Sequence, residues 1–152
     1  MNLKKENFNV HFNLLEKFSF TNRISLKRFI HQLFKKERKT ILRLDYIFCS
    51  DDYLLKINQE FLDHDYLTDI ISFDLSANHQ SVTGEIYISI DRIKENARRF
   101  DTSFSNELFR VMFHGALHLC GYNDKTNHEK SLMTKKEDYY LNLYKRFQQR
   151  ST

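Results

Sequence analysis

The order of apolar and polar residues predicts strands that alternate with helices along the first part of the chain. Residues 8–14 alternate as in a half-buried strand, and residues 41–50 form an apolar and aromatic run typical of a buried strand. Between them, four apolar residues recur at the spacing of one helix face: Leu26, Phe29, Ile30 and Leu33. This spacing predicts a helix over 25–38, with Ser25 as its N-terminal cap.

The same patterns predict two more strands and four more helices. The strands cover 69–75 and 85–90 and are joined by a loop around 78–83. The helices cover 51–61, 91–100, 105–120 and 127–147. One side of the last helix carries Leu132, Lys136, Tyr139, Tyr140, Leu143 and Phe147. Strands mixed with helices, followed by two closing helices, predict an α+β fold with one small mixed β-sheet covered by helices.

Length and composition place this fold in a single domain over 1–152. A chain of 152 residues can bury a core without disulfides, so Cys49 and Cys120 are expected to be buried free thiols in a reducing compartment. The N-terminus lacks the apolar region of a secretory signal, and no apolar run reaches the length of a membrane span. We therefore expect a soluble, cytoplasmic protein.

Charge is unevenly distributed along the chain. The net charge is +4, yet residues 23–43 hold eight Lys or Arg and one acid, whereas residues 45–74 hold eight acids and one Lys. On the helix over 25–38, four basic residues lie opposite the apolar face: Lys27, Arg28, Lys35 and Arg38. Such a face can bind a polyanion, although most basic helix faces are simply solvated.

The stretch FHGALHLCGYNDKTNHE, residues 113–129, carries the candidate chemistry. His114 and His118 are four residues apart on a helix, so one ion can contact both rings. Gly121 permits a sharp reversal that brings a following residue back towards them. The spacing His-x3-His-x2-Gly-x2-Asp matches the metzincin frame and favours Asp124 as the third ligand, with His128 as the alternative. Three ligands leave the open position of a catalytic zinc site, with one Zn²⁺ per chain.

Gly115 stands where a zinc peptidase places its general-base glutamate. A metal-bound water can instead supply the nucleophile, because the ion lowers the pKa of that water. This chemistry suits attack on a phosphodiester.

These residues resemble a known family. HGALHLCGYND is similar to the HGxLHLxGYDH signature of the YbeY family, the bacterial zinc-dependent endoribonucleases of ribosomal RNA maturation. INQEFLDHDYLTDIISF resembles the segment of that family ending in PTDVLSF, and GEIYIS resembles its GDIxIS strand. The resemblance implies a YbeY-like metal-dependent hydrolase domain whose last strand runs antiparallel along the cleft, over 68–74, with Ser72 as a polar contact.

The chain departs from the family pattern at four positions. Asp124 stands where the family has its third histidine, and Asn123 stands where the family has the aspartate before that histidine. Leu62 replaces an arginine that the resemblance implies as a substrate contact, and Leu67 replaces a proline. The Asp124 carboxylate can still bind the metal, but its negative charge should weaken the Lewis acidity of the ion. Arg110, one turn before His114, is a candidate to replace the lost arginine, although a surface pair with Glu107 is the simpler expectation. His64 is a further candidate for positive charge near the cleft.

The leading hypothesis is a zinc-dependent endoribonuclease for single-stranded RNA. Its catalytic and metal residues are His114, His118 and Asp124, and its substrate contacts are Arg110, Ser72 and His64. The resemblance implies ribosomal RNA and the small ribosomal subunit as partners, with ribosome-associated proteins as further partners and a role in small-subunit maturation and ribosome quality control. The alternatives are a non-catalytic ribosome-assembly protein that binds RNA and holds a structural zinc, and a zinc peptidase, which Gly115 disfavours.

Overall fold

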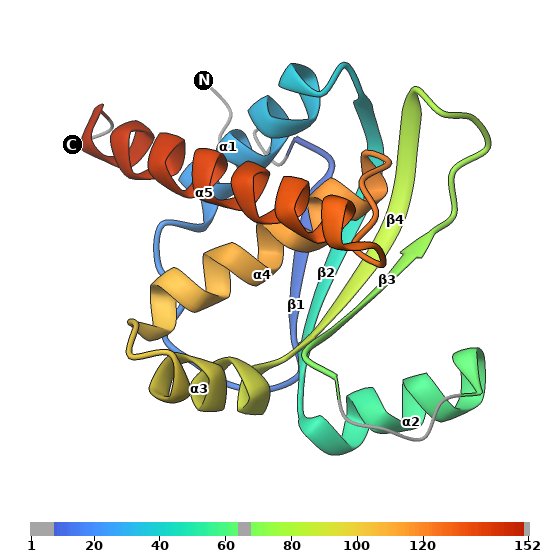
Figure 1. The fold of residues 1–152 in the computed structure, drawn as a ribbon, viewed down its shortest axis with the longest axis vertical. Helices are drawn as coiled ribbons and strands as arrows, with labels where there is room; N and C mark the ends of the chain where they lie inside the picture. Colours follow the sequence, from blue (N-terminus) through green and yellow to red (C-terminus); the bar gives the residue numbers. More distant parts are fainter. Residues whose placement is uncertain (1–7, 64–67, 151–152) are drawn as a thin grey trace.

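A computed structural model describes residues 8–63 and 68–150 (Figure 1). In chain order its elements are β1 (Val10–Leu14), α1 (Arg23–Lys36), β2 (Thr40–Cys49), α2 (Asp51–Leu62), β3 (Ile70–Asp74), β4 (Ser81–Ser89), α3 (Ile90–Arg99), α4 (Phe104–Leu119) and α5 (Asn127–Arg150). The predicted α+β class with one small mixed sheet is confirmed. None of the helices in the described ranges has the length and apolar composition needed to cross a membrane.

The sheet has four strands in the order β1-β2-β4-β3. The first three pair in parallel, and β3 pairs antiparallel with β4, with Ser72 opposite Ile86. β3 is therefore an edge strand, and it contacts α4, the helix that carries the histidines. The antiparallel last strand implied by the family resemblance is thus present.

Helices cover the two faces of the sheet unequally. α1, α4 and α5 lie on one face, where β2 and β4 contribute Leu44, Tyr46, Phe48, Ile86 and Ile88 to the main core (Figure 1). α2 contacts β3 and β4 on the other side, around a small cluster of Cys49, Leu54, Ile57 and Ile71. Both cysteines are free, and Cys49 is buried while Cys120 is half-buried. The larger core therefore supports α4, the helix that carries the candidate metal site.

Three local predictions are wrong. α1 begins two residues before Ser25, after Asn22, whose carbonyl accepts from the Leu26 amide. β4 begins at Ser81 rather than residue 85, because pairing with β2 extends as far as Thr40 and shortens the loop. The predicted side of α5 is wrong at Leu132 and Tyr139, which are 40% and 48% exposed, whereas Tyr140 is buried and Leu143 and Phe147 pack against the core. The other buried residues of α5 are Met133, Glu137, Leu141 and Tyr144.

Gly115 brings α4 into close contact with the sheet. A Cβ atom at this position would lie 2.8 Å from Ile70 Cδ1 and 2.9 Å from Ile86 Cγ2. Contacts this short require a neighbour to move, since protein cores are packed at the density of organic crystals. Gly115 therefore faces β3 and β4, whereas His114 and His118 are both partly exposed on the side of the cavity described below.

Glu37, just after α1, connects three parts of the fold. Its carboxylate accepts hydrogen bonds from the Tyr122 hydroxyl at 2.6 Å, from Lys136 Nζ at 3.2 Å and from the Tyr140 hydroxyl. Burial alone would raise the pKa of Glu37, but these three donors lower it below its ordinary value. The ionised carboxylate is therefore favoured in the folded state.

A Glu37→Gln variant should lower the free energy of unfolding by about 1–3 kcal/mol at neutral pH, because a charged acceptor of three donors is lost. The pKa of Glu37 is lower in the folded chain than its ordinary 4.5. Its contribution is therefore present above pH 4.5 and is lost as the pH falls through the folded-state pKa. Urea unfolding at pH 7 and at about pH 3 measures both values.

Glu60→Gln is the matched control, because Glu60 is exposed on α2. Its unfolding free energy should stay within about 0.5 kcal/mol of the wild type at both pH values. A Glu37→Gln deficit of the same size at acid and neutral pH would contradict the charge-based account.

Candidate metal centre

The two candidate histidines lie near the C-terminal end of α4. Their Nε2 atoms are 2.9 Å apart, as expected for side chains one helical turn apart on the same face. The helix then ends in a Schellman motif: the Tyr122 amide donates to the Leu117 carbonyl and the Gly121 amide to the His118 carbonyl. Gly121 has φ +105°, so the turn predicted at this glycine is present.

This turn brings Asp124 to the histidines. Asp124 Oδ2 is 3.2 Å from His114 Nε2 and 3.3 Å from His118 Nε2. A capping box then starts α5, since the Glu129 amide donates to Thr126 Oγ1 and the Thr126 amide to the Glu129 carboxylate. The loop between Gly121 and α5 is thus held at both ends. His128 lies exposed at the start of α5, and in the described ranges the candidate ligand cluster comprises His114, His118 and Asp124 without it.

The three donor atoms lie close enough together to bind one zinc ion. Ligands about 2.0–2.1 Å from a tetrahedral ion lie about 3.3 Å from one another. The observed separations of 2.9, 3.2 and 3.3 Å fall close to that value. Two nitrogens and one carboxylate oxygen also form a donor set that zinc accepts.

Hydrogen bonds on the far side of each ring favour the tautomer that a metal needs. His118 Nδ1 lies 2.8 Å from the Tyr122 carbonyl and His114 Nδ1 lies 2.6 Å from Glu137 Oε2, and both oxygens are acceptors. Each Nδ1 therefore carries the proton, and in a neutral ring Nε2 presents a lone pair. Two lone pairs and a carboxylate that face one another repel unless a cation lies between them. The arrangement therefore fits a bound metal ion.

Glu137 links His114 to Arg110. It is a buried residue on α5, and its second oxygen accepts from Arg110 Nη1 at 2.9 Å, while Arg110 Nη2 donates to Asp138 at 2.6 Å. The predicted pair of Arg110 with Glu107 is therefore wrong, because the guanidinium turns towards α5. Burial alone would lower the pKa of His114, but the hydrogen bond to Glu137 and nearby acids raise it.

A cavity of about 470 Å³ opens beside the three donors. Its walls come from the β3 edge, from α4 and from the loop before α5: Thr68, Asp69, Ile70, Ser72, Asp74, His114, His118, Leu119 and Asp124. In the part of the chain that the structure describes, Ser72 Oγ is the one buried side-chain oxygen or nitrogen without a hydrogen-bond partner. Ser72 thus lines the cavity with a hydroxyl that is buried and makes no hydrogen bond within the described residues.

Asp69 and Glu137 were not predicted as site residues. Asp69 lines this cavity and a neighbouring one that also contains Arg110, and burial raises its pKa. Its partner Asn96 lies on α3, 3.4 Å from Asp69 Oδ2, so only the folded chain brings the two together. Glu137 was missed because it lies outside the predicted apolar side of α5. His64, a predicted substrate contact, lies outside the described residues.

Comparisons with known proteins agree with this geometry. The family model described as Endoribonuclease YbeY matches residues 12–145. Proteins named Endoribonuclease YbeY are similar to the chain: one from Cytophaga hutchinsonii is 49% identical over 84% of this chain and 90% of its own. Another, from Flavobacterium psychrophilum, is 46% identical over 91% of this chain and 94% of its own. A solution structure of a Thermotoga maritima protein aligns with TM-score 0.66 and 31% identity over 89% of this chain and 88% of that one.

Proposed function

The chain belongs to the YbeY endoribonuclease family, and we propose that it is a zinc-dependent endoribonuclease that cleaves single-stranded ribosomal RNA. Its cellular role would be ribosomal RNA processing in the cytoplasm, with small-subunit maturation and ribosome quality control as the processes served. The small ribosomal subunit and ribosome-associated proteins would be its partners. The observation that carries the metal dependence is the convergence of His114, His118 and Asp124, with each imidazole held by an acceptor on its far side.

Each group at the site has a defined part in this proposal. A zinc ion held by the three donors would polarise a phosphate oxygen and lower the pKa of a coordinated water. Ser72 lines the cavity, and its unpartnered hydroxyl would donate to a phosphate oxygen once a rotation of the side chain exposes it. Arg110 would meet a phosphate only in competition with Glu137 and Asp138, which hold its guanidinium. Substrate positioning in the cavity therefore rests mainly on Ser72 and the β3 edge.

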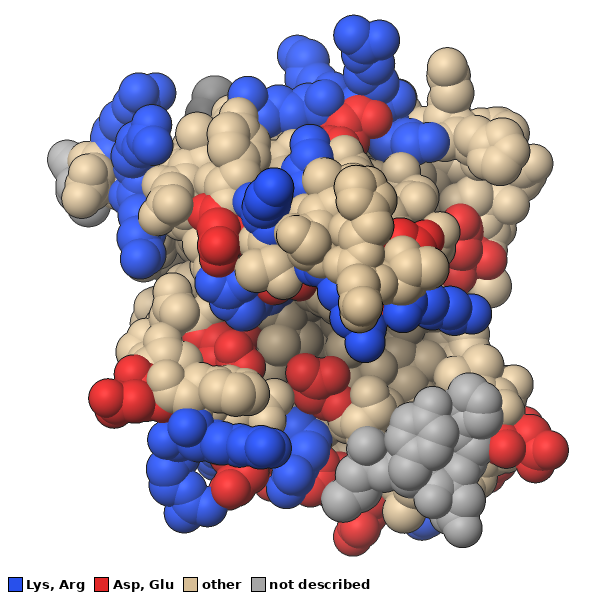
Figure 2. Space-filling model, in the orientation of Figure 1, with Lys and Arg blue, Asp and Glu red and all other residues tan. Residues whose placement is uncertain are grey.

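Nonspecific affinity for RNA would come from the basic residues of the α1 region. Figure 2 shows Lys and Arg crowding the top of the view, where Figure 1 places the end of α1 and the start of β2. Lys35 and Arg38 are exposed, whereas Lys27 and Arg28 are half-buried and lie over the rings of Phe12 and Phe8. Binding through such residues weakens with salt.

One observation favours the non-catalytic alternative. Leu62, at the end of α2, is 39% exposed and places no charge where the family pattern has an arginine. A protein that binds RNA and holds a structural zinc would need no such cation. The peptidase alternative has no similar support, because Gly115 faces the sheet.

Metal removal and replacement test the proposal. Purified protein should cleave single-stranded ribosomal RNA fragments, lose this activity on chelation, and recover it when zinc is restored at one ion per chain. Circular dichroism at each step checks that the fold is kept. RNA binding without cleavage in zinc, manganese and magnesium would select the non-catalytic alternative.

A further inference from the structure

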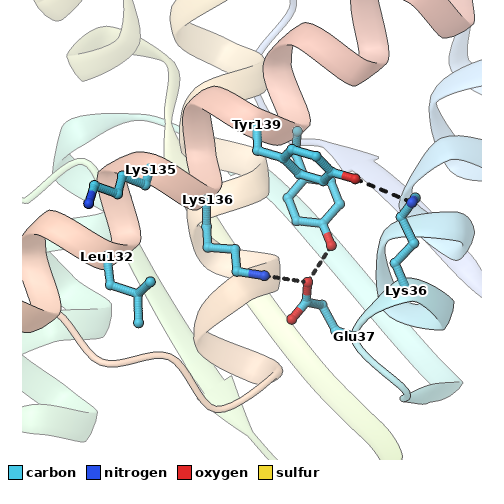
Figure 3. Close-up of a pocket in the computed structure, with 7 residues that line it drawn as sticks. Lys36, Glu37, Leu132, Lys135, Lys136 and Tyr139 are labelled. Atoms are coloured by element: carbon cyan, nitrogen blue, oxygen red, sulfur yellow. Dashed lines mark hydrogen bonds and ion pairs between the residues drawn. The ribbon is translucent and has the colours of Figure 1, made fainter.

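A second cavity, of about 400 Å³, lies between the end of α1 and α5. Figure 3 shows the residues that line it, of which six are labelled: Lys36, Glu37, Leu132, Lys135, Lys136 and Tyr139. None of these is among the metal donors. Three ammonium groups, one carboxylate and two exposed apolar or aromatic side chains thus surround one space.

The charge of this cavity is positive after its internal pairs are counted. Glu37 is its one acid, and its oxygens already accept from Tyr122, Tyr140 and Lys136. Lys135 points away from Glu37 in Figure 3 and makes no ion pair within the described residues. Lys36 donates only to a neutral hydroxyl, that of Tyr139, at 3.3 Å. Two cations, Lys36 and Lys135, therefore have no anionic partner here, which suits an anionic ligand.

Tyr139 gives the cavity an aromatic surface. Tyr139 is 48% exposed to solvent, so it is not on the buried face of α5. The Lys36 ammonium lies 3.3 Å from the hydroxyl but 5.8 Å from the ring centre, so it sits beyond the hydroxyl end of the ring. Tyr140 meets the ring at 82°, as an edge contact. A flat aromatic group can therefore reach Tyr139 beside the Lys36 ammonium, while Lys135 lies farther along α5 in Figure 3.

Tyr122 connects this cavity to the metal centre. Its hydroxyl donates to Glu37, its ring lies 5.3 Å from Lys136 Nζ, and its carbonyl accepts from His118. The turn that holds a candidate metal ligand is thus also bonded, through the Tyr122 hydroxyl, to Glu37 in the lining of this cavity.

We propose that the cavity between α1 and α5 is a second subsite for single-stranded RNA, in which a base stacks on Tyr139 and the flanking phosphates contact Lys36 and Lys135. The cavity suits a ligand that is anionic and also carries flat aromatic groups. A nucleic acid strand has both, because its phosphates alternate with its bases. Aromatic rings bind bases without sequence preference, and lysines bind the phosphates between them. The subsite deepens the proposed function, because it would hold a part of the substrate strand away from the scissile phosphate.

Binding of a 2′-O-methyl oligouridylate to the zinc-loaded protein tests the subsite. Fluorescence anisotropy measures the dissociation constant, and a gel after each titration checks that the oligonucleotide is intact. Tyr139→Ala should weaken binding about tenfold because one stacking contact is lost, whereas Tyr139→Phe should bind like the wild type. Lys135→Ala should reduce the slope of log K against log salt concentration by about 0.7, the value for one phosphate contact on a single strand.

Lys94→Ala is the matched control, since Lys94 is an exposed lysine on α3, outside the lining of this cavity. An unchanged dissociation constant for Tyr139→Ala would overturn the proposal, and so would an equal loss for Lys94→Ala and Lys135→Ala. Circular dichroism of each variant excludes unfolding as a cause. If the wild type binds this probe but does not cleave unmodified RNA, the proposed activity fails while the subsite is still tested.

Discussion

A His118→Ala variant should keep its fold and lose both zinc and RNA cleavage. His118 is half-exposed and its far-side partner is a backbone carbonyl, so its loss leaves no buried charge without a partner. The candidate metal site would retain only His114 and Asp124. Metal-derived stabilisation of a phosphoryl transition state is worth several kcal/mol, so we expect cleavage to fall about 1,000-fold.

The measurements are the zinc content of the purified variant and its initial rate of cleavage of single-stranded RNA. His128→Ala is the control, because it removes an exposed histidine that lies four residues beyond Asp124 and outside the donor cluster. It should keep both zinc and activity. If His118→Ala is as active as the wild type at matched zinc content, the proposed role of this donor set is wrong.

A Glu137→Gln variant should bind zinc about 10–100 times more weakly, because partners beyond the ligands orient them and increase their basicity. Glu137 accepts from His114 with one oxygen and from Arg110 with the other. A glutamine can keep only one of these two hydrogen bonds, since its NH₂ group would face a donor. Glu137 is thus a positioning residue, and competition with a chromophoric chelator measures the change in zinc affinity directly.

Asp138→Asn provides the matched control for this prediction. Asp138 also pairs with Arg110, at 2.6 Å, but it is exposed and does not contact His114. Zinc affinity should therefore stay unchanged in Asp138→Asn. Equal affinities for Glu137→Gln and wild type would show that the carboxylate serves packing rather than the orientation of His114.

Local patterns were sufficient for the type and order of the elements and for the candidate ligands, but not for the first residues of α1 and β4. The pair His114 and His118 depends only on helical spacing, and Gly121 determines where the chain reverses. Asp124 follows from that reversal, because a Schellman turn directs the chain back along the helix end. These features lie within 11 residues of one another, so the sequence alone could predict that they meet.

The supporting residues come from distant parts of the chain and could not be predicted in this way. Glu137 reaches His114 across 23 positions, and its inward direction depends on how α5 packs on α4. A helix rotated by one residue would bury Lys136 instead, which is the face that apolar periodicity favoured. Asp69 and Asn96 likewise meet only because β3 pairs with β4 at the edge of the sheet. The position of a buried polar residue depends on the particular group that hydrogen-bonds to it, and the periodicity of apolar residues does not reveal that group.

The close contact of Gly115 with the sheet affects whether this fold could gain the catalytic glutamate of a zinc peptidase. A glutamate at this position would give the chain the His-Glu pair of a zinc peptidase. A Cβ atom here would lie 2.8 Å from Ile70 Cδ1 and 2.9 Å from Ile86 Cγ2, so a larger side chain would have to displace either these two side chains or the helix. A displacement of the helix would also move both histidines relative to Asp124. A glutamate at position 115 therefore meets a steric obstacle at the sheet before its chemistry can matter.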